Sequence, residues 1–461
     1  MRYVSTRGRA PALGFQDAIL SGLARDGGLY VPESWPTLAP ETIRGFAGQS
    51  YEEVAYTVMR PFVGDAFDDA TFRNLIERAY APFAHIARCP LKELRPGHWL
   101  LELFHGPTLA FKDVAMQLIG QMFEEVLSRD GRRVTIVGAT SGDTGSAAIE
   151  AFRGNAAVDV FILYPDGRVS EVQRRQMTTP PEDNVHALAL AGDFDACQAR
   201  LKDLFNDLDF RDEVGLAGVN SINWARVLAQ VVYFFTAGAA LGAPDRPVSF
   251  SVPTGNFGDV FAGYVAKRMG LPVDQLVIAT NQNDILHRTL ESGEHRKGEV
   301  RPSISPSMDI QVSSNFERLL FDLYDREGEA VSALMEELKA GGFSLAQGAL
   351  ERLRAEFSSG RLSEAETLDA IRDWHSATGE VLCPHSAIGV AVGEALRSPA
   401  VPMITLATAH PAKFPDAVER AVGTRPPLPP HMAGLFERDE RVTQVADDLG
   451  ALKTLIRERR R

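Results

Sequence analysis

Short apolar runs alternate with segments of helical periodicity along most of the chain, from about residue 98 onward. Runs such as VDVFILYP (158–165) and QLVIATN (275–281) have no polar face, which is typical of strands covered on both sides. The segment at 114–131 instead repeats an apolar residue every four positions and ends at a glycine, as amphipathic helices do. This alternation predicts an α/β fold with parallel sheets, in which ligands bind at the carboxyl ends of the strands.

The same two patterns predict further elements. Strands are expected near 98–104, 134–137, 184–192, 247–253 and 401–406. Helices are expected near 50–61, 68–80, 170–178, 195–208, 220–242, 260–270 and 385–398.

Three regions differ from the alternating pattern. Residues 1–90 predict a separate N-terminal unit, with a short helix, a glycine turn and an extended LYVP segment before two further helices. Residues 91–424 form the predicted catalytic region, but the stretch at about 324–380 within it is charged and helical. We interpret this stretch as a helical insertion or cap. Residues 425–461 form a tail with two proline pairs and a final helix.

Composition narrows the class of protein. A chain of 461 residues with 45% hydrophobic and 24% charged residues is typical of a globular protein of two or three domains. Its net charge of −13 argues against nucleic acid or an anionic membrane as partner, so an anionic substrate needs a local basic pocket.

Localisation follows from the cysteines and the hydrophobic stretches. Cys89, Cys197 and Cys383 are odd in number and far apart, which predicts free thiols in a reducing compartment. The first residues contain no secretory signal, and the most hydrophobic stretch (227–243) is rich in alanine and glycine and flanked by charges. We therefore predict a cytoplasmic protein that has no membrane partner.

The sequence HGPTLAFKD (105–113) places Lys112 at or just before the start of the helix predicted at 114–131. The positive end of the helix dipole and the apolar neighbours both disfavour an ammonium group, so we expect a lowered pKa for Lys112. A lysine that forms a Schiff base needs such an amine. The alternative is a surface lysine whose stem covers Phe111, which is the commoner case for a lone lysine.

A first glycine-rich turn, GATSGDTGSAA (138–148), follows a predicted strand and opens a helix. Its glycine spacing also occurs in nucleotide-binding reductases, but Asp143 would repel a pyrophosphate and no acidic residue ends the next strand to hold a ribose. The hydroxyls of Thr140, Ser141 and Thr144 at a helix N-terminus suit a carboxylate or a ring hydroxyl. A tight turn without a ligand remains the alternative.

A second turn, PTGNFGD (253–259), is the better candidate for a phosphate. Gly255 and Gly258 permit positive φ, so that consecutive amides can point into one concavity just before a helix. Asn256 adds a side-chain donor. Most glycine turns between a strand and a helix bind nothing, and this alternative stays open.

Two further stretches place polar groups at the ends of elements. NSINWAR (220–226) puts Ser221 and Arg226 at the start of an apolar helix, where they are either ligands or helix caps. ATAHPAKF (407–414) puts Thr408 at the end of an apolar strand, where threonines more often fill the core.

Taken together, these stretches resemble the threonine synthase family in its longer form, a member of the pyridoxal-phosphate enzymes of fold type II. The resemblance covers nearly the whole chain in order. It extends through GLARDGGLYVP, HGPTLAFKD, GATSGDTGSAA, YPDGRVSEVQRRQM, NSINWAR, GNFGD, SSNFERLLF and ATAHPAKF. It implies two open α/β domains with parallel-type sheets, pyridoxal 5′-phosphate as cofactor, no metal and a monomer.

The resemblance also implies roles for single residues. Lys112 would carry the cofactor and act as the catalytic base, and Thr408 would hydrogen-bond the pyridine nitrogen. The turn Gly255, Asn256, Phe257, Gly258 and Asp259 would hold the cofactor phosphate. Ser141, Gly142, Asp143 and Thr144 would meet the substrate carboxylate and the cofactor O3′. Ser221 and Arg226 would hold the substrate phosphate. The chain departs from its relatives at Asp166, Arg168 and Cys383, which leaves the basic lining near 166–174 open.

The activity implied is that of a carbon–oxygen lyase acting on phosphates, which converts O-phospho-L-homoserine and water into L-threonine and phosphate in the last step of threonine biosynthesis. A serine/threonine dehydratase or a phospholyase is the alternative among enzymes. An inactive cofactor-binding regulatory protein is the alternative outside them. A short-chain reductase is disfavoured because the expected YxxxK pair is missing downstream.

Overall fold

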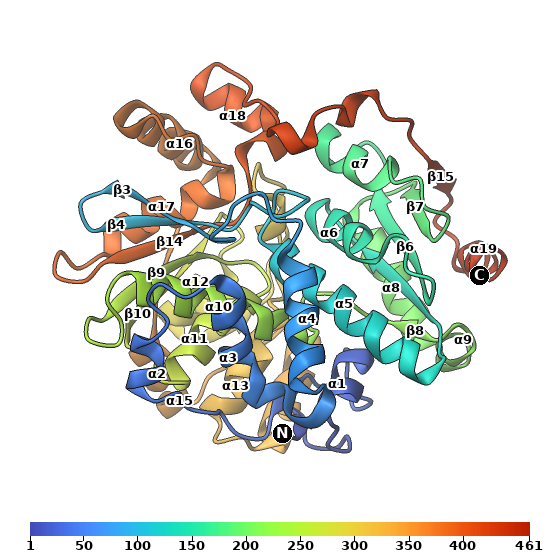
Figure 1. The fold of residues 1–461 in the computed structure, drawn as a ribbon, viewed down its shortest axis with the longest axis horizontal. Helices are drawn as coiled ribbons and strands as arrows, with labels where there is room; N and C mark the ends of the chain where they lie inside the picture. Colours follow the sequence, from blue (N-terminus) through green and yellow to red (C-terminus); the bar gives the residue numbers. More distant parts are fainter.

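The computed structural model describes residues 1–461 and contains two open parallel sheets that face each other across the middle of the molecule (Figure 1). The order of the six-stranded sheet is β13-β10-β9-β14-β4-β3, and only β3 runs antiparallel to its neighbour. Its strands are β3 (Leu91–Arg95), β4 (His98–Glu102), β9 (Val248–Pro253), β10 (Val273–Thr280), β13 (Phe357–Arg361) and β14 (Met403–Ala407).

The order of the five-stranded sheet is β15-β7-β6-β5-β8, and all of its strands are parallel. Its strands are β5 (Val134–Ala139), β6 (Val158–Pro165), β7 (Val185–Leu190), β8 (Leu216–Ala217) and β15 (Val442–Val445). Two short antiparallel ribbons complete the strands: β1 (Tyr3–Ser5) with β2 (Tyr30–Pro32), and β11 (Glu294–Arg296) with β12 (Gly342–Ser344). The predicted α/β class with two parallel-type sheets is confirmed.

The first group of helices covers the N-terminal region and the five-stranded sheet. They are α1 (Phe15–Ser21), α2 (Pro40–Arg44), α3 (Tyr51–Val63), α4 (Asp69–Tyr80), α5 (Lys112–Asp130), α6 (Asp143–Phe152), α7 (Glu171–Thr178), α8 (Phe194–Asn206) and α9 (Leu208–Val214). The second group is α10 (Trp224–Ala240), α11 (Gly258–Arg268), α12 (Ile285–Ser292), α13 (Phe316–Leu323), α14 (Gly328–Lys339), α15 (Gln347–Glu356), α16 (Glu364–Thr378), α17 (Pro384–Leu396), α18 (Pro415–Val422) and α19 (Leu449–Arg459). The main 3₁₀ turns are η1 (Gly64–Ala66), η2 (Pro306–Met308), η3 (Pro411–Lys413), η4 (Pro430–Met432) and η5 (Leu435–Glu437).

The helix α10 forms the centre of the hydrophobic core. All but two of its residues are buried, which confirms that the most hydrophobic stretch of the sequence is a core helix. No helix of the structure combines the length and the apolar character that crossing a bilayer requires. The three cysteines are free, as predicted, and all three are buried.

Residues 1–90 pack directly against this centre. The helices α3 and α4 contact α10 and α5, and their buried side chains belong to the same continuous cluster as those of the six-stranded sheet. The N-terminal region therefore has no hydrophobic core of its own, and a domain boundary near residue 90 remains a prediction.

The stretch at 324–380 is not a purely helical cap. It contributes β13, which pairs in parallel with β10 and forms one edge of the six-stranded sheet. The sequence of β13, FSSGR, has a single large apolar residue, because an edge strand with a partly exposed face needs few. Hydrophobic patterning could not distinguish it from a loop between two helices.

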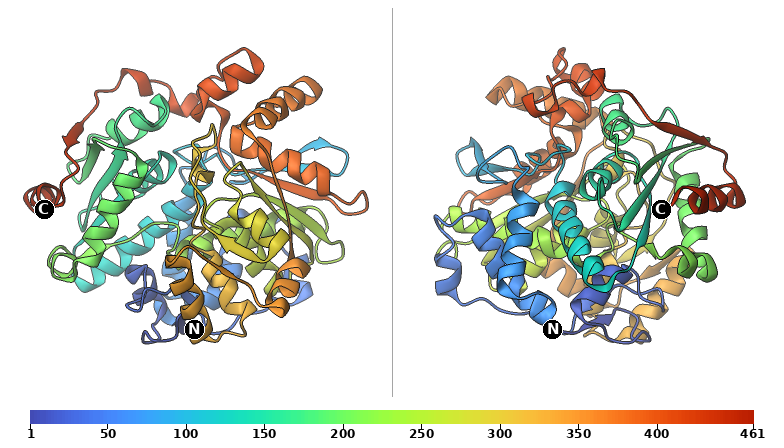
Figure 2. Two further views of the ribbon diagram at one scale, coloured as in Figure 1. Left: turned by 180° about the vertical axis from the view of Figure 1, so that it is seen from behind. Right: turned by 45° about the vertical axis from the view of Figure 1, so that its right-hand side comes forward.

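The C-terminal tail crosses from one sheet to the other. After α18 the chain passes α7 and reaches the edge of the five-stranded sheet, where β15 pairs with β7 and α19 packs on α8 (Figure 1 and Figure 2, red). The predicted final helix is confirmed, but the strand was missed since VTQV is short and half polar.

Candidate active site

A cavity of about 450 Å³ lies between the carboxyl ends of the two sets of strands. Most of the predicted site residues line it: Lys112, Ser141, Asp143, Thr144, Ser221, Arg226, Gly255, Asn256, Phe257, Gly258, Asp259 and Thr408. Gly142 does not, because its amide donates to Thr140 Oγ1 (2.9 Å) and the side chain of Gln173 fills the space beside it. Asp166, Arg168 and Cys383 are also absent from the lining.

Lys112 is the first residue of α5 and is 7% exposed. Its Nζ lies 3.3 Å from Ser307 Oγ and 3.4 Å from Asp143 Oδ2. Burial lowers the pKa of the Lys112 amine; the charge of Asp143 opposes this, and those of Arg226 and Lys413 reinforce it. The expected direction of the pKa shift is confirmed, with burial as its main cause.

The loop before Lys112 is fixed by hydrogen bonds to Asp113. Asp113 is fully buried, and its carboxylate accepts from the amide (2.7 Å) and the hydroxyl (2.6 Å) of Thr108. Gly106 must be a glycine here, because a Cβ atom would lie 2.5 Å from that of Asp113. These contacts hold the Lys112 backbone in place at the start of α5.

The turn at 253–259 leaves a group of backbone amides without hydrogen-bond acceptors, and we call the amides of residues 255–260 the amide cradle. From Gly255 to Val260 no backbone N–H donates to a protein group, and the dipole of α11 points at the same place. The sequence predicted that positive φ at Gly255 and Gly258 would orient these amides, and this explanation was partly wrong. The residue with positive φ is Phe257 (65°), and neither glycine has it. Gly255 is required for another reason, since a Cβ atom there would overlap the carbonyl oxygen of Ser307.

Arg226 is a buried cation that has no acidic partner within hydrogen-bond distance. It is 3% exposed, and its Nε and Nη1 make no hydrogen bond. Burial lowers its pKa to about 10, opposed by electrostatic interactions with Tyr233 and Asp259. A guanidinium held this way is complementary to an anion in the cavity, because a buried charge is costly unless it is paired.

The carboxylate of Asp259 does not serve an anion directly. It accepts from the Tyr233 hydroxyl, and burial raises its pKa to about 7, opposed by the Tyr233 bond and the charge of Arg226. Only its backbone amide belongs to the cradle.

The segment Ser141–Thr144 offers amides rather than its carboxylate. The N–H groups of Ser141, Asp143 and Thr144 donate to no protein group, whereas both carboxylate oxygens of Asp143 are engaged. A substrate carboxylate is compatible with those amides at the N-terminus of α6.

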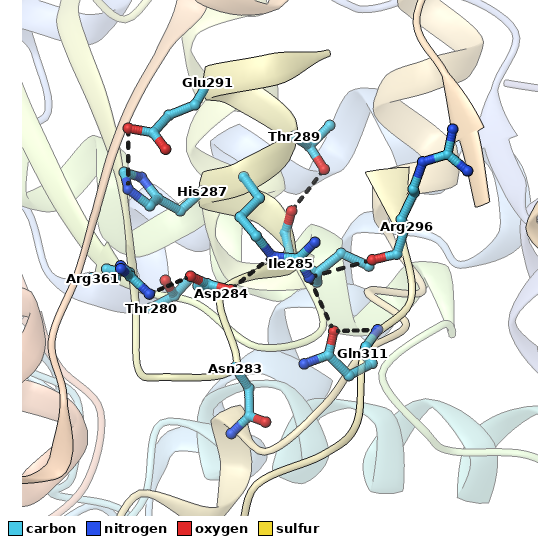
Figure 3. A network of polar contacts seen from close by, with 12 residues as sticks. Thr280, Asn283, Asp284, Ile285, His287, Thr289, Glu291, Arg296, Gln311 and Arg361 are labelled. Atoms are coloured by element: carbon cyan, nitrogen blue, oxygen red, sulfur yellow. Dashed lines mark hydrogen bonds and ion pairs between the residues drawn. The ribbon is translucent and has the colours of Figure 1, made fainter. Parts of the chain in front are cut away.

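A polar network braces the wall at 297–315. Asp309, which lines the cavity, accepts from Asn283 Nδ2 (2.9 Å). Gln311, another lining residue, accepts from Arg288 Nη2 (3.4 Å) and from the amide of Gly298 (3.1 Å). Figure 3 shows Gln311 and Asn283 beside the start of α12, which anchors this wall.

The sequence patterns did not reveal the role of Asn315 and Arg318, which hydrogen-bond to the backbone of two turns at the cavity. Asn315 Nδ2 donates to the carbonyls of Ser221 and Asn256, both at 3.0 Å, and so ties the two candidate anion sites together. Arg318, which is completely buried, donates to Asn315 Oδ1 and to the carbonyls of Tyr30 and Ile222. Both stand in SSNFERLLF, but nothing in that stretch indicates which carbonyls they meet.

Three family models match consecutive parts of the chain: threonine synthase N terminus (2–80), pyridoxal-phosphate dependent enzyme (83–361) and threonine synthase, C-terminal (386–456). A threonine synthase from Pseudomonas aeruginosa is 54% identical over 459 residues, covering 99% of this chain and 98% of that protein. The chain belongs to the threonine synthase family. It is therefore related to enzymes that depend on pyridoxal phosphate, as its sequence motifs implied.

Solved structures of the family agree with the fold. The structure of a threonine synthase from Brucella melitensis with bound pyridoxal phosphate has a TM-score of 0.97 at 56% identity, with 100% of both chains covered. The yeast threonine synthase has a TM-score of 0.94 at 39% identity, covering 99% of this chain and 98% of that one.

The residues present fit the cofactor of the threonine synthases. The amide cradle at 255–260 can bind a phosphate, the Lys112 amine is buried with a lowered pKa, and Thr408 brings an unused hydroxyl to the same cavity. A phosphate, an aldehyde and a pyridine nitrogen are the three groups that such a set can hold.

Gly255→Val is expected to remove most of the bound cofactor and to weaken cofactor retention far more than it destabilises the fold. The valine Cβ would overlap the Ser307 carbonyl and displace the amides from the phosphate. Gly258→Val should act more weakly, since its Cβ would lie 3.2 Å from Asn315 Nδ2. The ratio of cofactor to protein after gel filtration measures this loss. Gly348→Val on α15, where a Cβ meets no atom, is the matched control, and equal cofactor content in all variants would contradict the cradle.

Proposed function

We propose that the protein converts O-phospho-L-homoserine and water into L-threonine and phosphate. The observation that supports this most directly is the presence of two anion-binding groups in one cavity. The first is the amide cradle at 255–260 and the second is the unpaired guanidinium of Arg226. A phosphorylated cofactor that acts on a phosphorylated substrate needs both.

The cofactor would be held by Lys112 through its amine, by the amides of Gly255, Asn256, Phe257, Gly258 and Asp259 through its phosphate, and by the Thr408 hydroxyl through its ring nitrogen. When bound, pyridoxal 5′-phosphate supplies an electron sink for the charge that remains when a proton leaves the substrate carbon. The substrate carboxylate would be bound by the amides of Ser141 and Thr144. Its phosphate would be bound by Ser221 and Arg226, whose planar donor fork matches phosphate oxygens.

Lys112 would move the protons. The lowered pKa of its amine favours the neutral form, which can accept the proton from Cα and then serve Cβ and Cγ. Ser307 Oγ, at 3.3 Å from Nζ, can hold the amine in position between transfers.

The alternative of a serine/threonine dehydratase is disfavoured by Arg226. A dehydratase substrate has no phosphate, so a buried guanidinium would remain unpaired in such a site. An inactive regulatory protein is disfavoured by the coexistence of Lys112, the cradle and Arg226 in one cavity. We extend the proposal to a monomer that acts in the cytoplasm on a small-molecule substrate.

Phosphate release from O-phosphohomoserine by the purified protein tests the proposed function. We expect stoichiometric phosphate and threonine, with no ammonia from serine or threonine. Ammonia release without phosphate release would instead support the dehydratase.

A further inference from the structure

A second lysine lies behind the cavity wall and has no role in the proposed function. Lys413 ends η3, directly after the strand β14 and Thr408, and its side chain is completely buried. Its Nζ has two protein partners: Asp143 Oδ1 at 2.8 Å and the carbonyl of Thr108 at 2.7 Å. A buried ammonium is costly, so this position requires both partners.

Asp143 stands between two ammonium groups. Its Oδ1 accepts from Lys413 and from Gln173 Nε2, both at 2.8 Å, and its Oδ2 faces Lys112 Nζ at 3.4 Å. Burial by itself would raise the pKa of Asp143, but the charges of Lys413 and Lys112 outweigh it and hold the carboxyl ionised. The shorter contact is with Lys413, so the carboxylate is neutralised whether or not Lys112 carries a proton.

The titratable groups around the Lys112 amine come from four elements, and those on three of them are charged. Asp143 on α6 is the one anion, Arg226 on α10 and Lys413 on η3 are the cations, and His385 on α17 is neutral because burial lowers its pKa to about 4. Without Lys413, Asp143 would have Lys112 as its only cationic partner and would hold it as an ammonium ion.

We propose that Lys413 is a positioning residue that engages the carboxylate of Asp143, so that the Lys112 amine can give up its proton without leaving a buried carboxylate unpaired. This proposal rests on the proposed role of Lys112 as the lysine that carries the cofactor. It gives the carboxylate of Asp143 the function of an internal counter-ion and leaves the backbone amide of Asp143 free for the substrate.

Lys413 also acts on the backbone that carries Lys112. The Thr108 carbonyl that it binds belongs to the loop that Asp113 fixes through the amide and hydroxyl of Thr108. Gln176 Nε2 donates to the same carbonyl at 3.1 Å. The position and the charge of the Lys112 amine therefore depend on one buried side chain from the far end of the catalytic region.

The proton affinity of Lys112 can be measured in the cofactor-free protein. Trace acylation with acetic anhydride across a pH series, followed by mass spectrometry of the Lys112 peptide, gives the midpoint of its titration. Lys413→Met should raise this midpoint by about one pH unit or more, since Asp143 is then free to pair with Lys112. Asp143→Asn should lower it, since two cations then face Lys112 without an anion. A general loss of structure would not shift the two variants in opposite directions.

Capture of added pyridoxal 5′-phosphate gives a second readout. The rate constant for capture, followed by borohydride reduction and mass spectrometry, should fall about tenfold near neutral pH in Lys413→Met and recover as the pH is raised. Lys267→Met is the matched control, because Lys267 forms a 2.7 Å ion pair with Glu356 that is remote from the cavity lining. It should change neither the midpoint nor the capture rate.

A folded Lys413→Met protein whose Lys112 midpoint equals that of the wild type would overturn the inference. If Lys413→Met does not fold, Asp143→Asn decides, and a midpoint that is not lowered overturns it equally. These measurements need no substrate. A failure of the proposed function is seen separately, as a normal Lys112 titration in a protein that releases no phosphate from O-phosphohomoserine.

Discussion

Lys112→Ala is expected to abolish turnover of O-phosphohomoserine, by more than about 10⁴-fold, and to leave no cofactor that borohydride can fix to the protein. One amine is assigned both the covalent attachment and the proton transfers, so no remaining group replaces it. The structure strengthens this expectation because Lys112 is the one lysine with Nζ inside the cavity and a hydroxyl and a carboxylate within 3.4 Å. Assays of phosphate release and peptide mapping after reduction measure the two effects.

The chain offers two lysines that make the mapping discriminating. Lys202 lines the cavity from α8 but is exposed, and Lys413 is buried but paired with Asp143. Reduced cofactor found on either of them in the wild type would show that Lys112 is not the attachment site. Lys267→Ala, outside the cavity, should keep both activity and cofactor.

Arg226→Ala should cost on the order of 30- to 3000-fold in kcat/KM for O-phosphohomoserine, because removing one partner of a buried charged pair costs roughly 2–5 kcal/mol. In the structure Nε and Nη1 of Arg226 are buried and form no hydrogen bond, so the guanidinium has already lost its water before an anion binds. Arg226→Lys should recover only part of the loss, since one ammonium cannot reproduce two parallel hydrogen bonds.

Cofactor content should survive both Arg226 changes, because the amides at 255–260 provide the other phosphate site. Arg268→Ala, exposed at the end of α11, is the control for a lost positive charge. Loss of cofactor from Arg226→Ala, or unchanged kcat/KM, would show that our assignment of the two phosphate sites is wrong.

The order of elements and the position of Lys112 were predictable because both depend on neighbours in sequence. A proline and a glycine before a four-residue periodicity predict a helix start, and α5 begins at Lys112 itself. The turn at 253–259 is equally local: a strand, small residues and a helix in succession leave amides without acceptors. The resemblance of motifs in order was sufficient for the family and its cofactor.

Conformation inside that turn was less predictable. Glycines suggested positive φ at Gly255 and Gly258, whereas the left-handed residue is Phe257, which is held by a ring contact with Phe316 from a distant helix. Gly255 is required by the Ser307 backbone, 52 positions further along the chain. Whether a side chain fits at such a position depends on tertiary packing. The glycines therefore identified the turn in the sequence but not the reason why Gly255 has to be a glycine.

The sequence by itself determined the α/β pattern, the lysine at a helix start and the glycine turns, because each follows from residues within a few positions of one another. It also determined the free thiols, which follow from the number of cysteines and their wide separation. Only the tertiary structure decided that Asn315 joins two turns, that β13 and β15 complete the sheet edges, and that Lys413 neutralises Asp143 from 270 positions away. The physical reason is that a buried charge or an edge strand is stabilised by its partner, and the identity of that partner depends on how the chain returns to the same place.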